Sequence, residues 1–135
     1  AEMKGDISYP ASLRHSERYP EDYATLERVS GKGVPVVSVL FSGRPVYAND
    51  LINMSDAFIA AWLPGTEGQG VTDVLFGGAK DFQGKLPFDW PRASCPETAR
   101  KPALFRRGYG LKLAKKSNLG RLPEDGVETC PALAE

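Results

Sequence analysis

The sequence predicts an α/β fold: a mostly parallel sheet with flanking helices, forming a partial α/β sandwich, and an irregular C-terminal tail. Residues 34–41 and 57–62 are continuous apolar runs of strand length, which is typical of strands covered on both faces of a parallel sheet. Between them lies a short segment that Asn49 or Asp50 could cap as a helix ending near Met54. Strand, crossover, strand is the pattern of a right-handed parallel unit.

A helix is predicted to begin at Pro20, because proline suits the first helical position, and to end at Gly31. Residues 1–19 are polar and have no clear period, so we expect a loop there. The face of the helix predicted to lie against the core comprises Tyr23, Leu26 and Val29.

A second helix is predicted after the strand at 57–62. Thr66 and Gln69 have the spacing of a capping box, and Gly77 and Gly78 supply a stop. The apolar face of this helix comprises Val71, Val74 and Leu75. The loop from Leu63 to Gly70 would follow the carboxyl end of a parallel strand, where ligands commonly bind.

The chain changes character after Gly78. Residues 85–91 and 104–113 are predicted as edge pieces, since prolines exclude the first of them from a sheet interior. Residues 114–135 form a polar tail that we expect to pack on the rest of the chain or to be poorly ordered. Two buried strands are few for an α/β sheet, so the chain is interpreted as part of a larger domain.

Composition excludes several classes of function. The 135 residues suit one domain, and 17 basic residues balance 17 acidic ones, so bulk charge draws the chain neither to nucleic acid nor to an anionic membrane. No apolar run is long enough for a membrane span, and the opening residues lack the pattern of a signal peptide.

The few residues suited to metal binding or redox chemistry do not form a motif. His15 is the single histidine, so no metal site is expected, and its polar surroundings predict a surface position. Cys95 and Cys130 fit neither a redox nor a zinc spacing; two free thiols and one disulfide are equally open.

Other candidate groups favour structural roles. Glu67 suits the favourable end of the helix dipole rather than acid/base chemistry, and Ser42 lacks the flanking pattern of a nucleophile. The side chains interpreted as packing or loop-bridging groups are Arg44, Trp90 and Tyr109.

Four consecutive blocks carry a family resemblance: VVSVLFSGRPV, SDAFIAAWLPGTEGQGVTDVLFG, GKLPFDWP and LFRRGYGL. In this order and spacing the chain resembles, from about Glu2 to Leu111, the latter half of the second domain of family 3 glycoside hydrolases. It is most similar to the exo-acting glucan glucohydrolases among them. The resemblance divides the chain into a partial C-terminal domain, residues 1–113, and the tail, residues 114–135.

The resemblance implies a catalytic site shared between two domains. In the family a barrel carries the aspartate nucleophile, and the α/β domain supplies a glutamate acid/base in a motif of the form E-x-K-G-D. Residues 2–6 read EMKGD, so Glu2 is the implied acid/base and Lys4 an orienting or substrate-contacting group. Trp62 ends a strand at the cleft, so it is a candidate for substrate contact beside its packing role. No cofactor is implied.

The implied partners are a β-linked glucose oligosaccharide or glucan and the N-terminal barrel of the same enzyme. Without that barrel the isolated chain is expected to be inactive and to expose apolar sheet surface that favours self-association. The implied location is periplasmic or extracellular. The alternative is a non-catalytic module that binds carbohydrate or a partner protein through the loop from Leu63 to Gly70.

Overall fold

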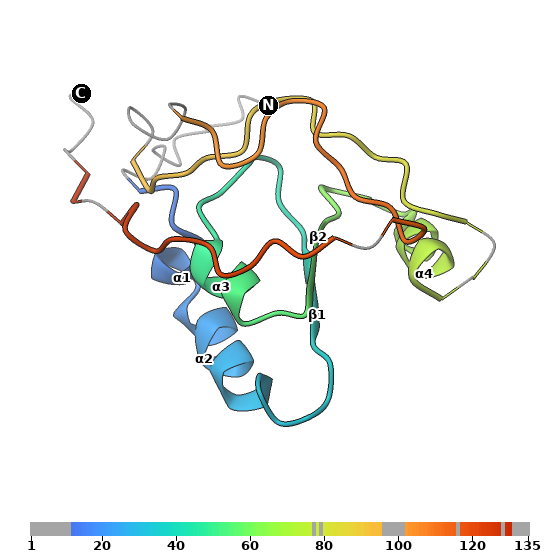
Figure 1. Cartoon of the computed structure of the whole chain (residues 1–135), viewed down its shortest axis with the longest axis horizontal. Helices are drawn as coiled ribbons and strands as arrows, with labels where there is room; N and C mark the ends of the chain where they lie inside the picture. The colour runs from blue at the N-terminus through green and yellow to red at the C-terminus, as the bar shows by residue number, and fades with distance from the viewer. Residues whose placement is uncertain are drawn as a thin grey trace, which may run out of the picture.

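The computed structural model describes residues 12–76, 78, 80–95, 102–115, 117–127 and 129–130. Its elements are α1 (His15–Arg18), α2 (Pro20–Val29), β1 (Val37–Leu40), α3 (Asn49–Asn53), β2 (Ala57–Ala60) and α4 (Gly68–Phe76). The two strands pair in parallel, with Val37 opposite Ala57 and Leu40 opposite Ala60. Helices α1, α2 and α3 lie on one side of this pair and α4 on the other (Figure 1). The predicted α/β class and parallel crossover are therefore confirmed.

The N-terminal helices agree with the sequence in part. Helix α2 begins at Pro20 as predicted, but α1 occupies residues expected to be a loop. Tyr23 and Leu26 are half-buried, whereas Val29 is 44% exposed, so its predicted core position is wrong. No helix in the described part of the chain has the length and apolar character to cross a bilayer.

The strands are not covered on both faces, which corrects the prediction made from their apolar runs. Leu40 is buried, but Val37 is 50% and Phe41 57% exposed. Both strands are also short, because the hydrogen-bonded ladder covers only four residues of each run. The apolar side chains are present, but the helices on the two sides of the pair leave Val37 and Phe41 exposed.

The core instead surrounds α3. Its buried apolar members are Leu40, Tyr47, Ala48, Leu51, Trp90, Ala93, Cys95 and Leu122. Asp50 in α3 joins α1 to this core, since its Oδ2 accepts hydrogen bonds from Arg14 Nη2 (3.1 Å) and Ser16 Oγ (2.5 Å). The predicted side-chain cap is wrong, because the N-cap position is Ala48 and Asn49 lies inside the helix.

Residues 85–91 and 104–110 pair with each other rather than with the sheet. Trp90 N donates to Phe105 O (2.7 Å), and Leu86 N donates to Tyr109 O (2.8 Å). The resulting antiparallel ribbon is irregular, with a single bridge between Trp90 and Phe105. The prediction of edge pieces of the sheet is therefore wrong, because the two segments satisfy their backbone groups on each other and the sheet of the described chain consists of β1 and β2.

The tail packs on α3, which was one of the two outcomes expected for it. Asn49 Nδ2 donates to Pro123 O (2.8 Å), and Asn53 Nδ2 donates to Leu122 O (2.9 Å). Asn53 Oδ1 in return accepts from Leu122 N (2.8 Å). Cys95 and Cys130 form a disulfide, with their Cα atoms 5.2 Å apart, which decides between the two open alternatives.

Candidate functional site

The carboxyl ends of β1 and β2 meet at one edge of the sheet. Ser42, just beyond β1, donates its N–H to the carbonyl of Trp62, just beyond β2 (3.2 Å). Ser42 Oγ also donates to Arg44 O (2.8 Å), which closes the turn after β1. The hydroxyl of Ser42 thus holds a turn, in agreement with the structural role predicted for it.

Trp62 has an unusual backbone conformation at this edge. Its φ of +57° makes it the only residue other than glycine with a positive φ in the described chain. For a bulky residue such a conformation costs about 1–3 kcal/mol and persists only where surrounding contacts enforce it. Its ring packs edge-on against Phe88, with centroids 5.2 Å apart, and tilts against Trp90 at 6.0 Å. Strain of this kind is typical of functional sites.

The aromatic contacts continue into the ribbon formed by residues 85–91 and 104–110. Trp90 is 3% exposed, so the packing role predicted for it is correct. Tyr109 stacks on Phe105 with ring centroids 4.5 Å apart, and burial raises the pKa of the Tyr109 hydroxyl above its ordinary value. Two rings of this ribbon, exposed Phe88 and buried Trp90, thus pack against Trp62.

The loop from Leu63 to Gly70 leads into α4, but not through the predicted capping box. The helix begins at Gly68, so the N-cap position is Glu67 and Thr66 lies one residue too early. Glu67 N donates to Pro64 O (3.0 Å), and this turn precedes the first residue of α4. The predicted apolar face is confirmed, since Val71, Val74 and Leu75 are half-buried over a hollow of about 290 Å³.

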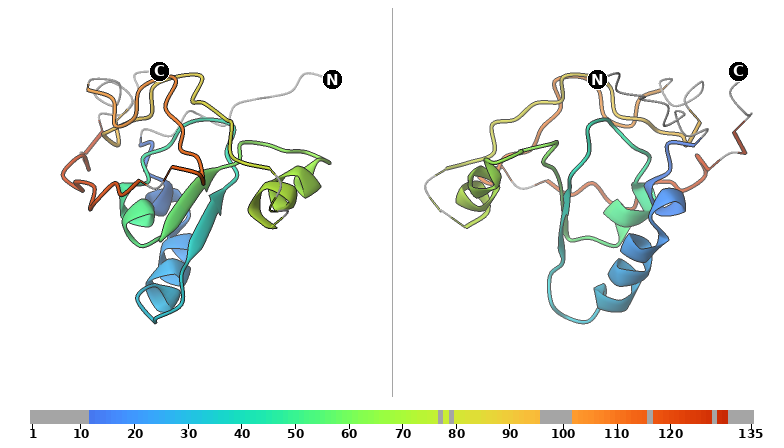
Figure 2. Two further views of the ribbon diagram at one scale, coloured as in Figure 1. Left: turned by 45° about the vertical axis from the view of Figure 1, so that its right-hand side comes forward. Right: turned by 180° about the vertical axis from the view of Figure 1, so that it is seen from behind.

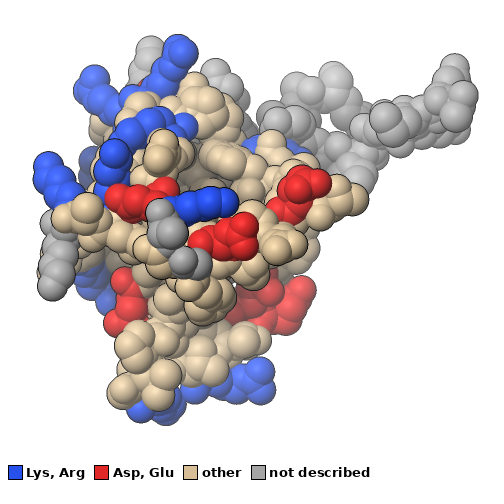
Figure 3. Space-filling model, turned by 90° about the vertical axis from the view of Figure 1, so that its right-hand side faces the viewer, with Lys and Arg blue, Asp and Glu red and all other residues tan. Residues whose placement is uncertain are grey.

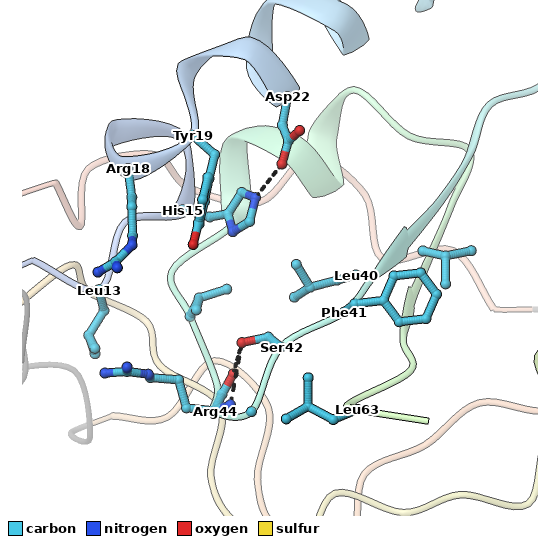
Figure 4. Close-up of a pocket in the computed structure, with 13 residues that line it drawn as sticks. Leu13, His15, Arg18, Tyr19, Asp22, Leu40, Phe41, Ser42, Arg44 and Leu63 are labelled. Carbon is cyan, nitrogen blue, oxygen red and sulfur yellow. Dashed lines mark hydrogen bonds and ion pairs between the residues drawn. The ribbon is translucent and has the colours of Figure 1, made fainter. Parts of the chain in front are cut away.

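A larger hollow, about 580 Å³, lies beside the end of β1, between it and α1 and α2 (Figure 4). Polar groups on its walls include His15, Arg18, Asp22 and Arg44. Apolar side chains on its walls include Leu13, Leu40, Phe41 and Leu63.

His15 is buried on the wall of this hollow, so the predicted surface position is wrong. Its exposure is 8%, because the Tyr19 ring covers it at a centroid distance of 4.9 Å. His15 Nε2 donates to Asp22 Oδ2 (2.8 Å), a bond that joins α1 to the first turn of α2 across Tyr19. In the sequence, the carboxylate of Asp22 seven residues later was the one indication that His15 could be paired.

Charges of both signs lie on the side of the molecule that carries α4 (Figure 3). They include the ion pair between Lys80 Nζ and Asp73 Oδ2, 3.7 Å apart and largely exposed. Among the described residues no cluster of three or more histidine, cysteine, aspartate or glutamate side chains could hold a metal ion. Glu2 and Lys4, the implied acid/base and its neighbour, lie outside the described residues.

Comparison with known proteins identifies the family to which this chain belongs. Residues 11–113 match the family model described as the glycosyl hydrolase family 3 C-terminal domain. The chain belongs to that family. The predicted domain boundaries at 1–113 and 114–135 remain predictions.

Several relatives support the assignment to family 3. The chain is 36% identical over 94 residues to a periplasmic beta-glucosidase of Salmonella typhimurium, covering 69% of this chain and 11% of the relative. A lysosomal beta glucosidase of Dictyostelium discoideum is 33% identical over 93 residues, covering 67% of this chain and 10% of the relative. The crystal structure of an exo-1,3/1,4-beta-glucanase from a Pseudoalteromonas species superposes with a TM-score of 0.76 at 39% identity.

These relatives are much longer than the present family 3 chain. The alignment with the exo-glucanase covers 89% of this chain but 16% of that chain. The chain is thus similar to one part of a multidomain glycoside hydrolase.

Proposed function

We propose that this chain is part of a retaining, exo-acting β-glucosidase or β-glucan glucohydrolase. It contributes Glu2 as general acid/base to a site shared with a barrel domain, and the substrate is a β-linked glucose oligosaccharide or glucan. The observation that carries the proposal is the family 3 match over residues 11–113, with the EMKGD pattern at residues 2–6, four residues before it.

The chemistry explains why a carboxyl group is needed at this place. In a retaining mechanism one carboxylic acid protonates the departing glycosidic oxygen and later deprotonates a water. A second carboxylate, about 5 to 5.5 Å from the first, attacks the anomeric carbon. Glu2 takes the first role, the barrel supplies the second, and no cofactor takes part. Lys4, two residues after Glu2, orients the acid or contacts the sugar.

The described part of the chain provides a wall for this site. Trp62 stands at the carboxyl edge of the sheet, and its backbone is held by Ser42 and its ring by Phe88. A flat aromatic ring fixed in this way presents an apolar face suited to a pyranose ring. Trp62 therefore contacts substrate in the assembled enzyme.

The disulfide and the relatives together support a location. Disulfides such as Cys95–Cys130 form and persist in oxidising compartments. Two relatives are named as periplasmic and lysosomal enzymes. The chain therefore acts in the periplasm or outside the cell.

The test is to mix the chain with the separately produced barrel domain of the same enzyme and to follow hydrolysis of a chromogenic β-glucoside. We expect no turnover by the chain alone and turnover after mixing. Glu2→Gln should lower that turnover by about 10²–10⁴-fold, as loss of a general acid does. Glu21→Gln, the same change at the exposed start of α2, is the matched control.

Two results would contradict the proposal. Turnover by the chain alone would mean that the barrel is not needed. Full activity of the Glu2→Gln mixture would remove Glu2 from the chemistry. The alternative module, binding glucan through the loop from Leu63 to Gly70, predicts glucan binding that mixing does not convert into turnover.

A further inference from the structure

Basic side chains are concentrated in one part of this chain. Residues 80–121 carry eleven lysines and arginines and three acids, whereas the remaining residues carry six basic and fourteen acidic side chains. The net charge of zero is therefore the sum of a positive segment and a negative remainder. Such a segment attracts anions to its own surface even though the whole chain is neutral.

The positive segment contains the ribbon of residues 85–91 and 104–110. The two chains of the ribbon stay together beyond its end, since Leu113 N donates to Asp81 Oδ1 (2.7 Å). Figures 1 and 2 show them side by side along the upper edge of the molecule, away from the end of α2. The second chain of the ribbon and the turn after it carry four exposed cations, which form the basic strip: Arg106, Arg107, Lys112 and Lys115.

The basic strip is not neutralised within the described chain. None of its four side chains forms an ion pair with a described acid. The two described acids of the positive segment are engaged by backbone groups instead. Asp81 Oδ1 accepts from Leu113 N–H, and Asp89 Oδ1 accepts from Arg107 N–H (2.7 Å). Asp81 offsets part of the charge of Lys112, so a positive excess remains, and basic side chains gather at the upper left of Figure 3.

The arrangement of the basic strip favours a linear polyanion. Its members follow one another along the ribbon, whereas a single bound anion requires donors that converge on one position. The ribbon also reaches the candidate cleft, since Phe88 packs against Trp62 with ring centroids 5.2 Å apart. A polymer on the strip would therefore lie beside the edge of the sheet at which Trp62 is proposed to contact glucan.

We propose that the basic strip is an auxiliary binding site for a linear acidic polysaccharide, one that carries carboxylate or sulfate groups. The site holds this polymer beside the cleft and does not hydrolyse it, so it retains the enzyme where acidic polysaccharides and glucans occur together. The choice of a polysaccharide over nucleic acid rests on the proposed function and its location in the periplasm or outside the cell. Because each exposed charge pair is weak, affinity should require several consecutive charges and should fall with added salt.

The test uses the full 135-residue chain, labelled with ¹⁵N, and oligomers of galacturonic acid, which carry one carboxylate on each sugar. We expect hexagalacturonate to shift the amide signals of the basic strip. It should bind about tenfold more tightly than digalacturonate, because it reaches further charges of the strip. The methyl-esterified hexamer, which has the same length without the charges, should not bind. Dextran sulfate, tested in parallel, separates a preference for sulfate from one for carboxylate.

The double variant Arg106→Gln, Arg107→Gln should weaken binding of the polyanion about tenfold, because two exposed charge pairs are lost. The matched control is Arg28→Gln, Lys32→Gln, which removes the same charge from exposed positions at the end of α2 and should retain the affinity. Equal weakening by both double variants would mean that overall charge alone attracts the polymer, and it would overturn the proposal.

Two further results would overturn the assignment of the basic strip. One is the absence of binding by both hexagalacturonate and dextran sulfate at low salt. The other is tighter binding to vesicles of equal parts phosphatidylglycerol and phosphatidylcholine that is lost in Leu113→Ser, since Leu113 is 64% exposed beside Lys112 and would then contact a membrane. None of these measurements requires Glu2 or the barrel domain, so the proposed function and the proposed strip fail separately.

Discussion

Among single residues, Asp50 carries the densest set of contacts in the described chain. Its side chain is buried, and it accepts hydrogen bonds from Arg14, Ser16 and the N–H of Leu51. A buried carboxylate is stable only when donors surround it in this way. Asp50 therefore fixes α1 on α3 through charge rather than through apolar packing.

Asp50→Asn should lower the free energy of unfolding by about 2–3 kcal/mol, because Arg14 loses its charge partner and one amide hydrogen faces other donors. Urea denaturation measures the change. Asp125→Asn, at an exposed position, should change stability by less than about 0.5 kcal/mol. Equal effects of the two substitutions would show that the contacts of Asp50 are not stabilising.

Because Trp62 has a positive φ, we expect its glycine variant to be more stable than its alanine variant, which is the reverse of the usual order. Trp62→Ala should cost about 2 kcal/mol through lost contacts with Phe88 and Trp90, and alanine would retain the strained φ. Trp62→Gly should be more stable than Trp62→Ala by about 1 kcal/mol, because glycine adopts this φ without strain.

Thermal unfolding of both Trp62 variants measures this difference. The same two changes at Trp90, where φ is not positive, should give the usual order with alanine the more stable. Alanine more stable than glycine at both positions would mean that the backbone of Trp62 carries no strain.

Sequence reasoning at this scale succeeded where a residue's role follows from its neighbours in the chain. Trp90 and Tyr109 pack as expected, and Ser42 closes a turn. It failed for His15, whose burial depends on Tyr19 and Asp22 being brought around a helix junction. Such a contact is set by the angle between two helices, which local polarity does not encode.

At the scale of elements, their identity and order were predictable, whereas their extents and caps were not. Helix α2 begins at Pro20, and the two apolar runs form a parallel pair. Four-residue ladders replaced the longer predicted strands, because strand length is set by pairing partners as well as by apolar residues. The capping box failed because a turn at Pro64 competed for the same residues.

Asp81 connects two irregular segments and gives the molecule a dependence on pH. Its Oδ1 accepts from Leu113 N (2.7 Å), a bond that lowers the pKa of the Asp81 carboxyl below its ordinary value of 3.8. The ionised form is therefore favoured in the folded chain. The stabilisation it brings is complete above the ordinary pKa and is lost as pH falls through the lowered one.

NMR titration of the side-chain carboxyl carbon should place the midpoint of Asp81 below 3.8. Asp81→Asn should lower the melting temperature near neutral pH, and the difference from the unmodified chain should shrink in acid. A difference that stays constant down to the lowest pH would mean that Asp81 acts without its charge.

At the scale of the whole molecule, the core lies around α3 rather than along the strand pair. It gathers around α3, residues 90–95 and Leu122, while β1 and α2 leave apolar residues in solvent. The prediction of a partial domain was based on two strands whose apolar side chains would need burial on both faces. Val37 and Phe41 are exposed. The position of the core depended on the tail, whose polar sequence shows no periodicity and gave no sign of its packing site.

Loss of the disulfide should destabilise the whole molecule. The bond joins residues 35 positions apart, so its removal should cost about 3–4 kcal/mol in the chain-entropy description. The double variant Cys95→Ser, Cys130→Ser should therefore melt at a lower temperature than the oxidised chain. A reducing agent should lower the melting temperature of the unmodified chain and leave that of the variant unchanged. Equal melting temperatures under both conditions would contradict a stabilising disulfide.

The disulfide also decides what a protease can release. It closes a covalent ring that contains the whole second half of the ribbon and the contacts of the tail on α3. A single cut between Cys95 and Cys130 opens this ring without dividing the molecule, and the two pieces separate only after reduction. In an oxidising compartment the chain can thus be nicked there and still remain one covalent unit.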